Sequence, residues 1–247
     1  MRIIAVKDAG QMGLEAARLM AGVVREKPEA VLGLATGSTP LGTYAELARL
    51  CAREGLDFSK ITSFNLDEYI GLDRDHPQSY FAYMKEHFVD LVNIAPENVF
   101  LPDGVAEDLE AECHEYDRLL ESYGFADLQL LGIGTNGHIA FNEPDDHFVA
   151  ATHKVALTAE TIQANQRFFD RLEDVPTHAI TLGMRGIMSA RQLVLIASGS
   201  GKARAIADAC FGPVTPKVPA SIIQLHANAV VIADREALAL TELAGQV

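Results

Sequence analysis

The chain reads VLGLATGSTPLGTYAELARLCARE over residues 31–54. A continuous apolar run comes first, a turn with glycine and proline follows, and the remainder carries apolar residues at helical spacing. Strands of a parallel sheet have continuous apolar runs because helices cover both of the sheet's faces. This stretch therefore predicts one strand–turn–helix unit of an α/β fold.

The same unit recurs along the chain, and no repeat or linker interrupts it. We therefore expect residues 1–247 to form a single domain, an open, mostly parallel, Rossmann-like sheet with helices on both faces. Besides 31–34, strands are predicted at 3–6, 61–66, 129–133, 179–182, 193–197 and 230–233, with weaker ones near Val99 and Val155. Helices are predicted at 10–26, 41–54, 79–89, 107–123, 161–169 and 202–210.

The composition excludes several classes of protein. Of 247 residues 49% are hydrophobic, which is enough to bury a core and argues against disorder. A net charge of −14, without any cluster of basic residues, argues against nucleic acid and anionic membrane surfaces as partners. Three widely spaced cysteines suggest reduced thiols, and no apolar run is long enough for a signal peptide or membrane helix. We expect a cytoplasmic protein.

Ligands of open α/β sheets bind beyond the carboxyl ends of the strands, so the loops that follow strands are the candidate sites. The first such loop contains Thr36, Gly37, Ser38 and Thr39. Gly37 allows a tight turn, Ser38 or Thr39 can cap the next helix, and Pro40 suits its first turn. Free N–H groups and hydroxyls there would cradle a phosphate, although an ordinary capped turn explains the loop equally well.

The second loop ends an apolar strand in two adjacent carboxylates, Asp67 and Glu68. Neighbouring side chains of an extended chain point to opposite sides, so at most one of the two faces a given cleft. A partly desolvated carboxylate at this point can act as a proton-abstracting base. The alternative is that both carboxylates face solvent or pair with an arginine.

The third loop, residues 131–144, contains the pattern G-x-G-x-x-G of dinucleotide-binding proteins. That pattern needs a helix to open at its third glycine, whereas here Pro144 follows closely and no helical periodicity appears. We interpret the loop instead as a glycine-rich turn that presents His138, Asn142 and Glu143. A histidine beside a carboxylate moves protons at neutral pH, so His138 is the best catalytic candidate.

The fourth loop, residues 197–203, again follows a strand and precedes a helix, with Lys202 at the helix start. It differs from a phosphate-binding Walker loop at Ile196 and Ala203. Lys202 is a sensible phosphate contact, the alternative being a surface lysine. Because the serine-hydrolase and zinc-hydrolase motifs are missing, the residues indicate a sugar phosphate undergoing proton transfer, without metal or cofactor.

Segments 35–40, 65–72, 137–144 and 165–169 together resemble the glucosamine-6-phosphate deaminase family, in order and in spacing, across nearly the whole chain. The resemblance implies that D-glucosamine 6-phosphate and water become D-fructose 6-phosphate and ammonia, without a cofactor. Asp67 would take the C2 proton and return it at C1, and His138, supported by Glu143, would open the sugar ring. Ser38, Thr39, Arg167 and Lys202 would hold the phosphate.

Two features depart from the family pattern. Many members have Asp where this chain has Asn136, which can bond to the ring nitrogen of His138 but cannot stabilise its charge, so we expect Glu143 to do so. Allosteric hexamers of the family use basic and serine residues where residues 145–153 read DDHFVAATH, and their carboxyl terminus is longer. We therefore expect a monomer or small homo-oligomer that N-acetylglucosamine 6-phosphate does not activate.

Two alternative functions stay open. A 6-phosphogluconolactonase would share the fold, and a non-catalytic sugar-phosphate sensor would share the binding site. The sensor would need a DNA-binding segment, for which a first strand at residue 3 leaves no room. We also hypothesise that residues 158–173 form a mobile lid, because they carry Arg167.

Overall fold

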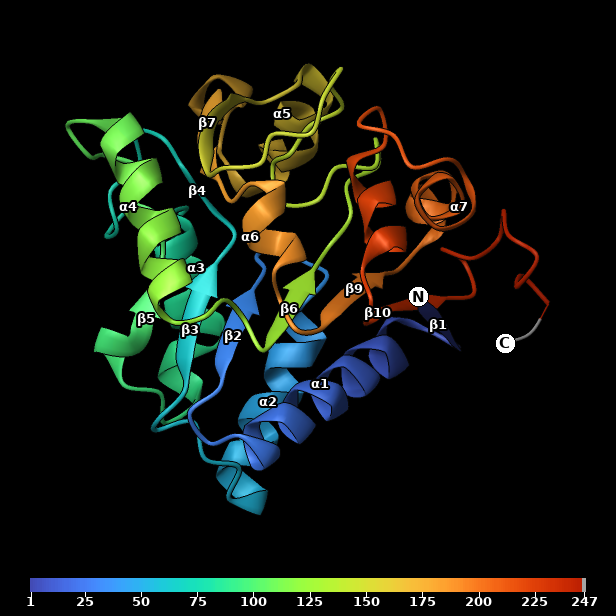
Figure 1. Ribbon diagram of the computed structural model, residues 1–247, viewed down its shortest axis with the longest axis horizontal. Coiled ribbons are helices and arrows are strands. Elements are labelled where there is room, and N and C mark those ends of the chain that lie inside the picture. The colour runs from blue at the N-terminus through green and yellow to red at the C-terminus, as the bar shows by residue number, and fades with distance from the viewer. Residues whose placement is uncertain (246–247) are drawn as a thin grey trace.

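The computed structural model describes residues 1–245, and its largest feature is a seven-stranded sheet (Figure 1). Every neighbouring pair of strands in this sheet is parallel. The predicted open parallel sheet is therefore confirmed. Its spatial order is β1 (Arg2–Val6), β10 (Ala229–Asp234), β9 (Leu193–Ala197), β6 (Leu128–Leu131), β2 (Val31–Leu34), β3 (Thr62–Asn65) and β5 (Val99–Phe100).

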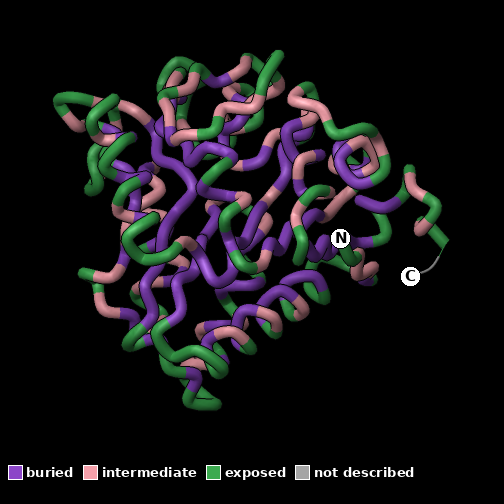
Figure 2. Tube along the Cα trace, viewed as in Figure 1, coloured by how far each residue is buried: buried purple, intermediate pink, exposed green. Residues whose placement is uncertain are grey.

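Helices cover both faces of this sheet, as predicted, because its side chains alternate between two apolar clusters. Along β9, Leu193 and Leu195 enter one cluster while Val194 and Ile196 enter the other. Figure 2 shows the central strands buried between the two layers. The first cluster contains side chains of α4 (Leu109–Ser122), α6 (Met184–Met188) and α7 (Ala203–Phe211). The second contains side chains of α1 (Ala9–Glu26), α2 (Leu41–Glu54) and α3 (Tyr80–His87).

A second, three-stranded antiparallel sheet lies above the main sheet in Figure 1, in the order β4 (Asp67–Tyr69), β8 (His178–Thr181), β7 (His153–Ala156). Our placement of residues 179–182 and the strand near Val155 in the main sheet is therefore wrong. Residues of β7 alternate between half-buried and exposed, which is typical of an antiparallel sheet with one face toward solvent. A parallel core strand would be buried throughout.

Leu66 joins the two sheets. Its N–H donates to the carbonyl of Leu34 in the main sheet at 3.3 Å, and its carbonyl accepts from the N–H of Leu182 at 2.7 Å. The predicted strand 61–66 thus ends early, and Asp67 begins a strand of the small sheet instead of a loop.

The predicted helix 161–169 also differs from the structure. Helix α5 (Ala159–Asn165) begins earlier because Thr158 caps it, and a 3₁₀ turn, η3 (Gln166–Phe168), replaces its end. Helix α6 has only five residues and was not predicted. The remaining 3₁₀ helices are η1 (Val89–Leu91), η2 (Pro96–Asn98), η4 (Leu172–Asp174), η5 (Ser200–Lys202) and η6 (Pro219–Leu225). Within residues 1–245, no helix has the length and apolar character needed to cross a membrane.

Candidate active site

A cavity of about 360 Å³ opens between the ends of the main strands, the small sheet and α5. This volume suits a small metabolite. The cavity receives residues from all four predicted loops. Of the predicted site residues, those that line it are Thr36, Gly37, Ser38, Thr39, Asp67, His138, Arg167 and Lys202. The other two, Asn136 and Glu143, contact His138 from outside the lining.

The loop after β2 forms one end of the cavity. Gly37 has a φ of +92°, a left-handed conformation that favours glycine, and its carbonyl accepts a hydrogen bond from the Tyr83 hydroxyl at 2.6 Å. Pro40 is the N-cap residue of α2, and no side chain caps the helix. The expectation that Ser38 or Thr39 caps it, with Pro40 inside the first turn, is therefore wrong, because the helix begins one residue later.

Two cations meet at this end. Arg167 of η3 donates from Nη2 to Ser38 Oγ at 3.2 Å, and the half-buried Lys202 stands immediately before α7. Burial lowers the pKa of Lys202, and the positive charge of Arg167 lowers it further. A bound anion would oppose both effects, because its negative charge stabilises the charged form of Lys202. In a chain with a net charge of −14, this end of the cavity is a local concentration of positive charge.

Asp67 lines the same cavity from a different element, β4 of the small sheet. It is only 6% exposed, and among residues 1–245 no group donates a hydrogen bond to its carboxylate. Burial and the neighbouring charge of Glu68 raise the pKa of Asp67 well above its usual range. Once deprotonated, this carboxylate is a strong base facing the cavity.

Glu68 points to the opposite side, as predicted for adjacent residues of an extended chain. Its carboxylate accepts hydrogen bonds from the backbone N–H groups of Tyr69, Tyr80 and Phe81 at 2.9 to 3.0 Å. Burial raises the pKa of Glu68 to about 7 even though these bonds oppose the shift. The alternative in which both carboxylates face solvent is therefore wrong. Glu68 anchors the start of α3, which brings Tyr80 to the cavity wall.

The glycine-rich loop after β6 serves to place His138. No helix opens at Gly137, so the structural context of a dinucleotide fingerprint is missing, as predicted. The N–H of Gly134 donates to the carbonyl of His138 at 2.9 Å. A Cβ atom at Gly134 would stand 2.4 Å from the imidazole ring. Only glycine leaves room for the ring to pack against this turn.

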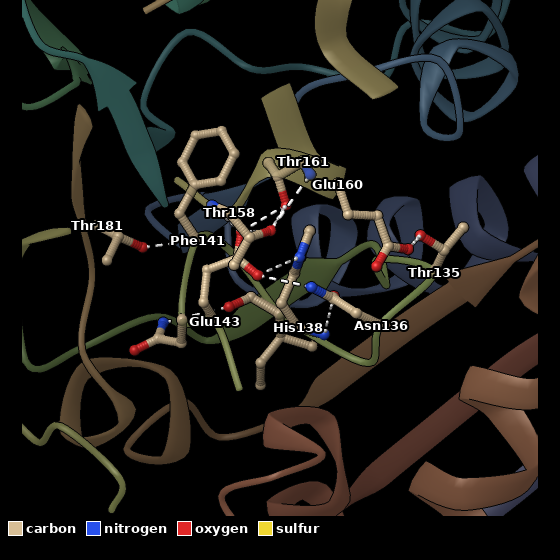
Figure 3. Close-up of polar contacts among 11 residues, drawn as sticks. Thr135, Asn136, His138, Phe141, Glu143, Thr158, Glu160, Thr161 and Thr181 are labelled. Atoms are coloured by element: carbon tan, nitrogen blue, oxygen red, sulfur yellow. Dashed lines mark hydrogen bonds and ion pairs between the residues drawn. The ribbon is translucent and has the colours of Figure 1, made fainter. Parts of the chain in front are cut away.

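Glu143 lies beside the imidazole (Figure 3). Nδ1 of His138 is 3.3 Å from Glu143 Oε2, and Asn136 Nδ2 donates to the same oxygen at 2.7 Å. The other end of the Asn136 amide accepts from the His138 backbone N–H at 3.2 Å. Glu143, the residue that we expected to support the ring, thus lies beside Nδ1, whereas Asn136 contacts Glu143 and the His138 backbone instead of the ring. Burial raises the pKa of Glu143, but His138 and the donated hydrogen bonds outweigh it and lower the value to about 2.

The sequence analysis missed several residues around these groups. Thr158 and Thr161 hydrogen-bond to the second oxygen of Glu143. The one available signal was Thr158 itself, a residue type preferred at helix starts. In contrast, Asn142, which we expected beside His138, is buried and donates to the carbonyls of Ile139 and Leu182, so its role is structural.

Asp234 is a further missed residue, at the end of β10 and only 5% exposed. Its carboxylate accepts hydrogen bonds from the Ser198 hydroxyl and from the N–H groups of Gly199 and Ala237. Gly199 has a φ of +90°. Asp234 therefore fixes the turn that leads into Lys202.

A parallel α/β sheet with a buried base and paired cations at its carboxyl edge is typical of enzymes that act on small anionic metabolites. Within that class, the chain belongs to the family of glucosamine-6-phosphate isomerases and 6-phosphogluconolactonases, whose model matches residues 8–232.

Similar proteins cover nearly the whole chain. The glucosamine-6-phosphate deaminase of Halothermothrix orenii is 52% identical, over 97% of this chain and 100% of its own length. That of Thermoanaerobacter pseudethanolicus is 50% identical, over 97% and 95%. Among solved structures, a monomeric glucosamine-6-phosphate deaminase of the NagB superfamily superposes with a TM-score of 0.96, at 45% identity, over 98% of this chain and all of its own. The 6-phosphogluconolactonase of Thermotoga maritima, at 21% identity with a TM-score of 0.73 over 94% and 99%, shares the fold.

Proposed function

We propose that the protein is a glucosamine-6-phosphate deaminase, which converts D-glucosamine 6-phosphate and water into D-fructose 6-phosphate and ammonia. Relatives at 50% identity and above, over nearly full length, have this activity in their names. The observation that carries the proposal is Asp67, a buried carboxylate without a hydrogen-bond donor among the described residues, which lines the same cavity as Arg167 and Lys202. That pairing suits proton abstraction from a phosphorylated substrate.

The cationic end holds the phosphate. Arg167 and Lys202 supply the charge, while Ser38, Thr39 and the uncapped N–H groups at the start of α2 supply hydrogen-bond donors. Thr36 and Gly37 shape the same loop. Holding the phosphate fixes the far end of the sugar against the base, so that binding energy lowers the barrier to proton transfer.

Proton transfers then complete the reaction. His138, with its charged form stabilised by Glu143, moves the proton that opens the pyranose ring. Asp67 removes the proton from C2 of the open chain while O1 takes up a proton, which leaves an enolamine, and Asp67 then returns its proton to C1 as the nitrogen loses one. The C2 imine that results takes up water and releases ammonia, which leaves the ketone of fructose 6-phosphate. Side chains alone perform each transfer, with no cofactor or metal.

We also place the protein in the cytoplasm, acting as a monomer on a small-molecule substrate without nucleic-acid or membrane partners. A solved relative at 45% identity is described as monomeric. Cys51, Cys113 and Cys210 are free thiols, which suits a reducing compartment.

Release of ammonia and fructose 6-phosphate from glucosamine 6-phosphate tests the proposal, with Asp67→Asn as the matched variant. The variant keeps the shape of the side chain but cannot take up the C2 proton. We expect kcat to fall by about 10²- to 10⁴-fold with little change in KM. Full activity in Asp67→Asn would contradict the assignment of the base. Wild-type hydrolysis of 6-phosphogluconolactone without deamination would favour the lactonase, and inactivity on both compounds would favour a sensor.

A further inference from the structure

The two oxygens of Glu143 are held by different parts of the chain. Oε2 faces the glycine-rich loop, where it contacts His138 and Asn136. Oε1 faces α5, where it accepts hydrogen bonds from the hydroxyls of Thr158 and Thr161 and from the Thr158 N–H (Figure 3). The side chain is only 7% exposed, and protein groups donate to both of its oxygens.

Thr161 makes the shorter of the two hydroxyl contacts with Oε1, and it is only 4% exposed. Thr158 has a second task, since its oxygen accepts the Thr161 N–H at 3.3 Å and caps α5. Among the described residues, the Thr161 hydroxyl forms hydrogen bonds with side chains and with no backbone group. It lines the cavity and donates to Glu143.

Rotation about the last bond of a glutamate side chain is soft and has no strong rotamer preference. Hydrogen bonds from α5 to Oε1 therefore decide where Oε2 points. They also favour the ionised carboxylate, because a hydroxyl donor stabilises the charged form. Both effects reach His138, whose Nδ1 depends on an ionised Oε2 that faces it.

We propose that Thr161 is a positioning residue of the active site: its hydroxyl orients Glu143 and keeps it ionised, and thereby aligns His138 for proton transfer. This inference rests on the proposed function, because alignment of His138 matters only if His138 moves a proton. Thr161 acts through Glu143 and need not touch the reacting atoms.

Three substitutions separate positioning from packing. Thr161→Val keeps the shape and removes the hydroxyl, whereas Thr161→Ser keeps the hydroxyl and removes the methyl group. Thr152→Val is the matched control, because Thr152 is equally buried at 4% exposure and donates to another buried carboxylate, Asp117, at 2.6 Å. Asp117 lies on α4, outside the cavity lining.

Deaminase kinetics give the first readout. We expect Thr161→Val to lower kcat about tenfold, the loss of one hydrogen bond to a charged group, with KM changed less than twofold. Thr161→Ser should stay within about twofold of the wild-type kcat, and so should Thr152→Val. The proposal is overturned if Thr161→Ser is as impaired as Thr161→Val, or if Thr161→Val has the wild-type kcat.

Titration of the Glu143 carboxyl carbon by NMR gives a second readout that requires no activity. The pKa of Glu143, lowered to about 2, should rise by about one pH unit in Thr161→Val and stay unchanged in Thr161→Ser and Thr152→Val. An unchanged titration in Thr161→Val overturns the proposal even if the enzyme is active. If the pKa of Glu143 rose in Thr161→Val but the wild-type protein had no deaminase activity, the positioning of Glu143 by Thr161 would stand and the proposed function would be rejected.

Discussion

At the scale of single residues, Asp67 and Glu68 show how one peptide bond separates two environments. Asp67 faces the cavity without a hydrogen-bond donor from the described residues, while Glu68 accepts three backbone N–H groups on the other side of β4. Burial raises the pKa of both carboxyls. The Asp67 carboxylate is available to accept a proton from a substrate, whereas hydrogen bonds fix the Glu68 carboxylate against the start of α3.

The pH dependence of kcat/KM should reflect Asp67. A base acts only when deprotonated, so the rate should fall as the pH decreases through a pKa well above the ordinary 3.8. Glu143, with a pKa of about 2, stays ionised across this range and contributes nothing to the decline. The phosphate of the substrate also titrates, near pH 6. The pH dependence of the inhibition constant of a non-reacting sugar phosphate measures how much this titration contributes to the change in kcat/KM. If the inhibition constant accounted for the whole fall of kcat/KM at acidic pH, Asp67 would titrate outside this pH range.

Glu68 should make folding stability depend on pH. The folded state holds its proton up to about pH 7, whereas the unfolded chain releases it near 4.5. The contribution of Glu68 to stability is therefore largest below pH 4.5 and declines as the pH rises toward 7, by up to about 3 kcal/mol. Urea denaturation at several pH values should show a smaller decline in Glu68→Gln, which cannot titrate. Equal declines in both proteins would contradict this origin.

Sequence reasoning located Asp67, His138, Lys202 and the loop at Ser38 because local signals mark them: an apolar run, a glycine turn, and a polar residue beyond it. It could not predict what surrounds them. Glu143 and Thr161 are 18 positions apart, and their contact depends on where α5 packs. Sequence proximity likewise left both Asn136 and Glu143 able to reach the imidazole ring, and only the three-dimensional structure shows that Glu143 lies beside it.

At the scale of elements, the turn from β9 into α7 depends on a carboxylate from another strand. Asp234 of β10 holds the turn through Ser198 and Gly199, and Lys202 follows three residues after Gly199. The placement of Lys202, our proposed phosphate contact, therefore depends on the register between β9 and β10.

Asp234→Ala should loosen this turn. We expect KM for glucosamine 6-phosphate to rise about tenfold while kcat changes little, because the lost contacts place a binding group and not a reacting one. Arg204→Ala provides a control, since the exposed Arg204 lies on α7 close to the turn and pairs with Asp208, one turn further along the same helix. A loss in kcat at unchanged KM would assign Asp234 a different role.

The small sheet could not be read from the sequence for a related reason. Residues 179–182 are buried throughout, like a core strand, so their pattern does not reveal which sheet they join. The alternation of β7 is visible only in the burial of its residues, because the sequence HKVA does not alternate between polar and apolar side chains.

At the scale of the whole molecule, the excess of negative charge and the cationic pocket coexist because charge acts locally. Screening limits a surface charge to about 8 to 10 Å in physiological salt, so distant carboxylates do not cancel Arg167 and Lys202. The protein can therefore bind an anion while its remaining surface stays acidic.

The molecule should act as a monomer with a hyperbolic dependence of rate on substrate. A second cavity of about 450 Å³ has Glu143 in its lining. The lining also includes the side chains of Asp145, His147, His153 and Lys154. We expect N-acetylglucosamine 6-phosphate to leave the rate curve unchanged. Sedimentation velocity and steady-state kinetics measure both properties. A sigmoidal curve that this compound makes hyperbolic would contradict the prediction.

Leu66, the residue shared by the two sheets, limits how this region can vary. Its N–H belongs to one sheet and its carbonyl to the other, so the chain has no slack between Asn65 and Asp67. Because side chains alternate along a strand, inserting or deleting one residue here would exchange the positions of Asp67 and Glu68 and turn the base away from the substrate. The length of this segment is therefore fixed, and we expect insertions and deletions at this point to abolish the activity.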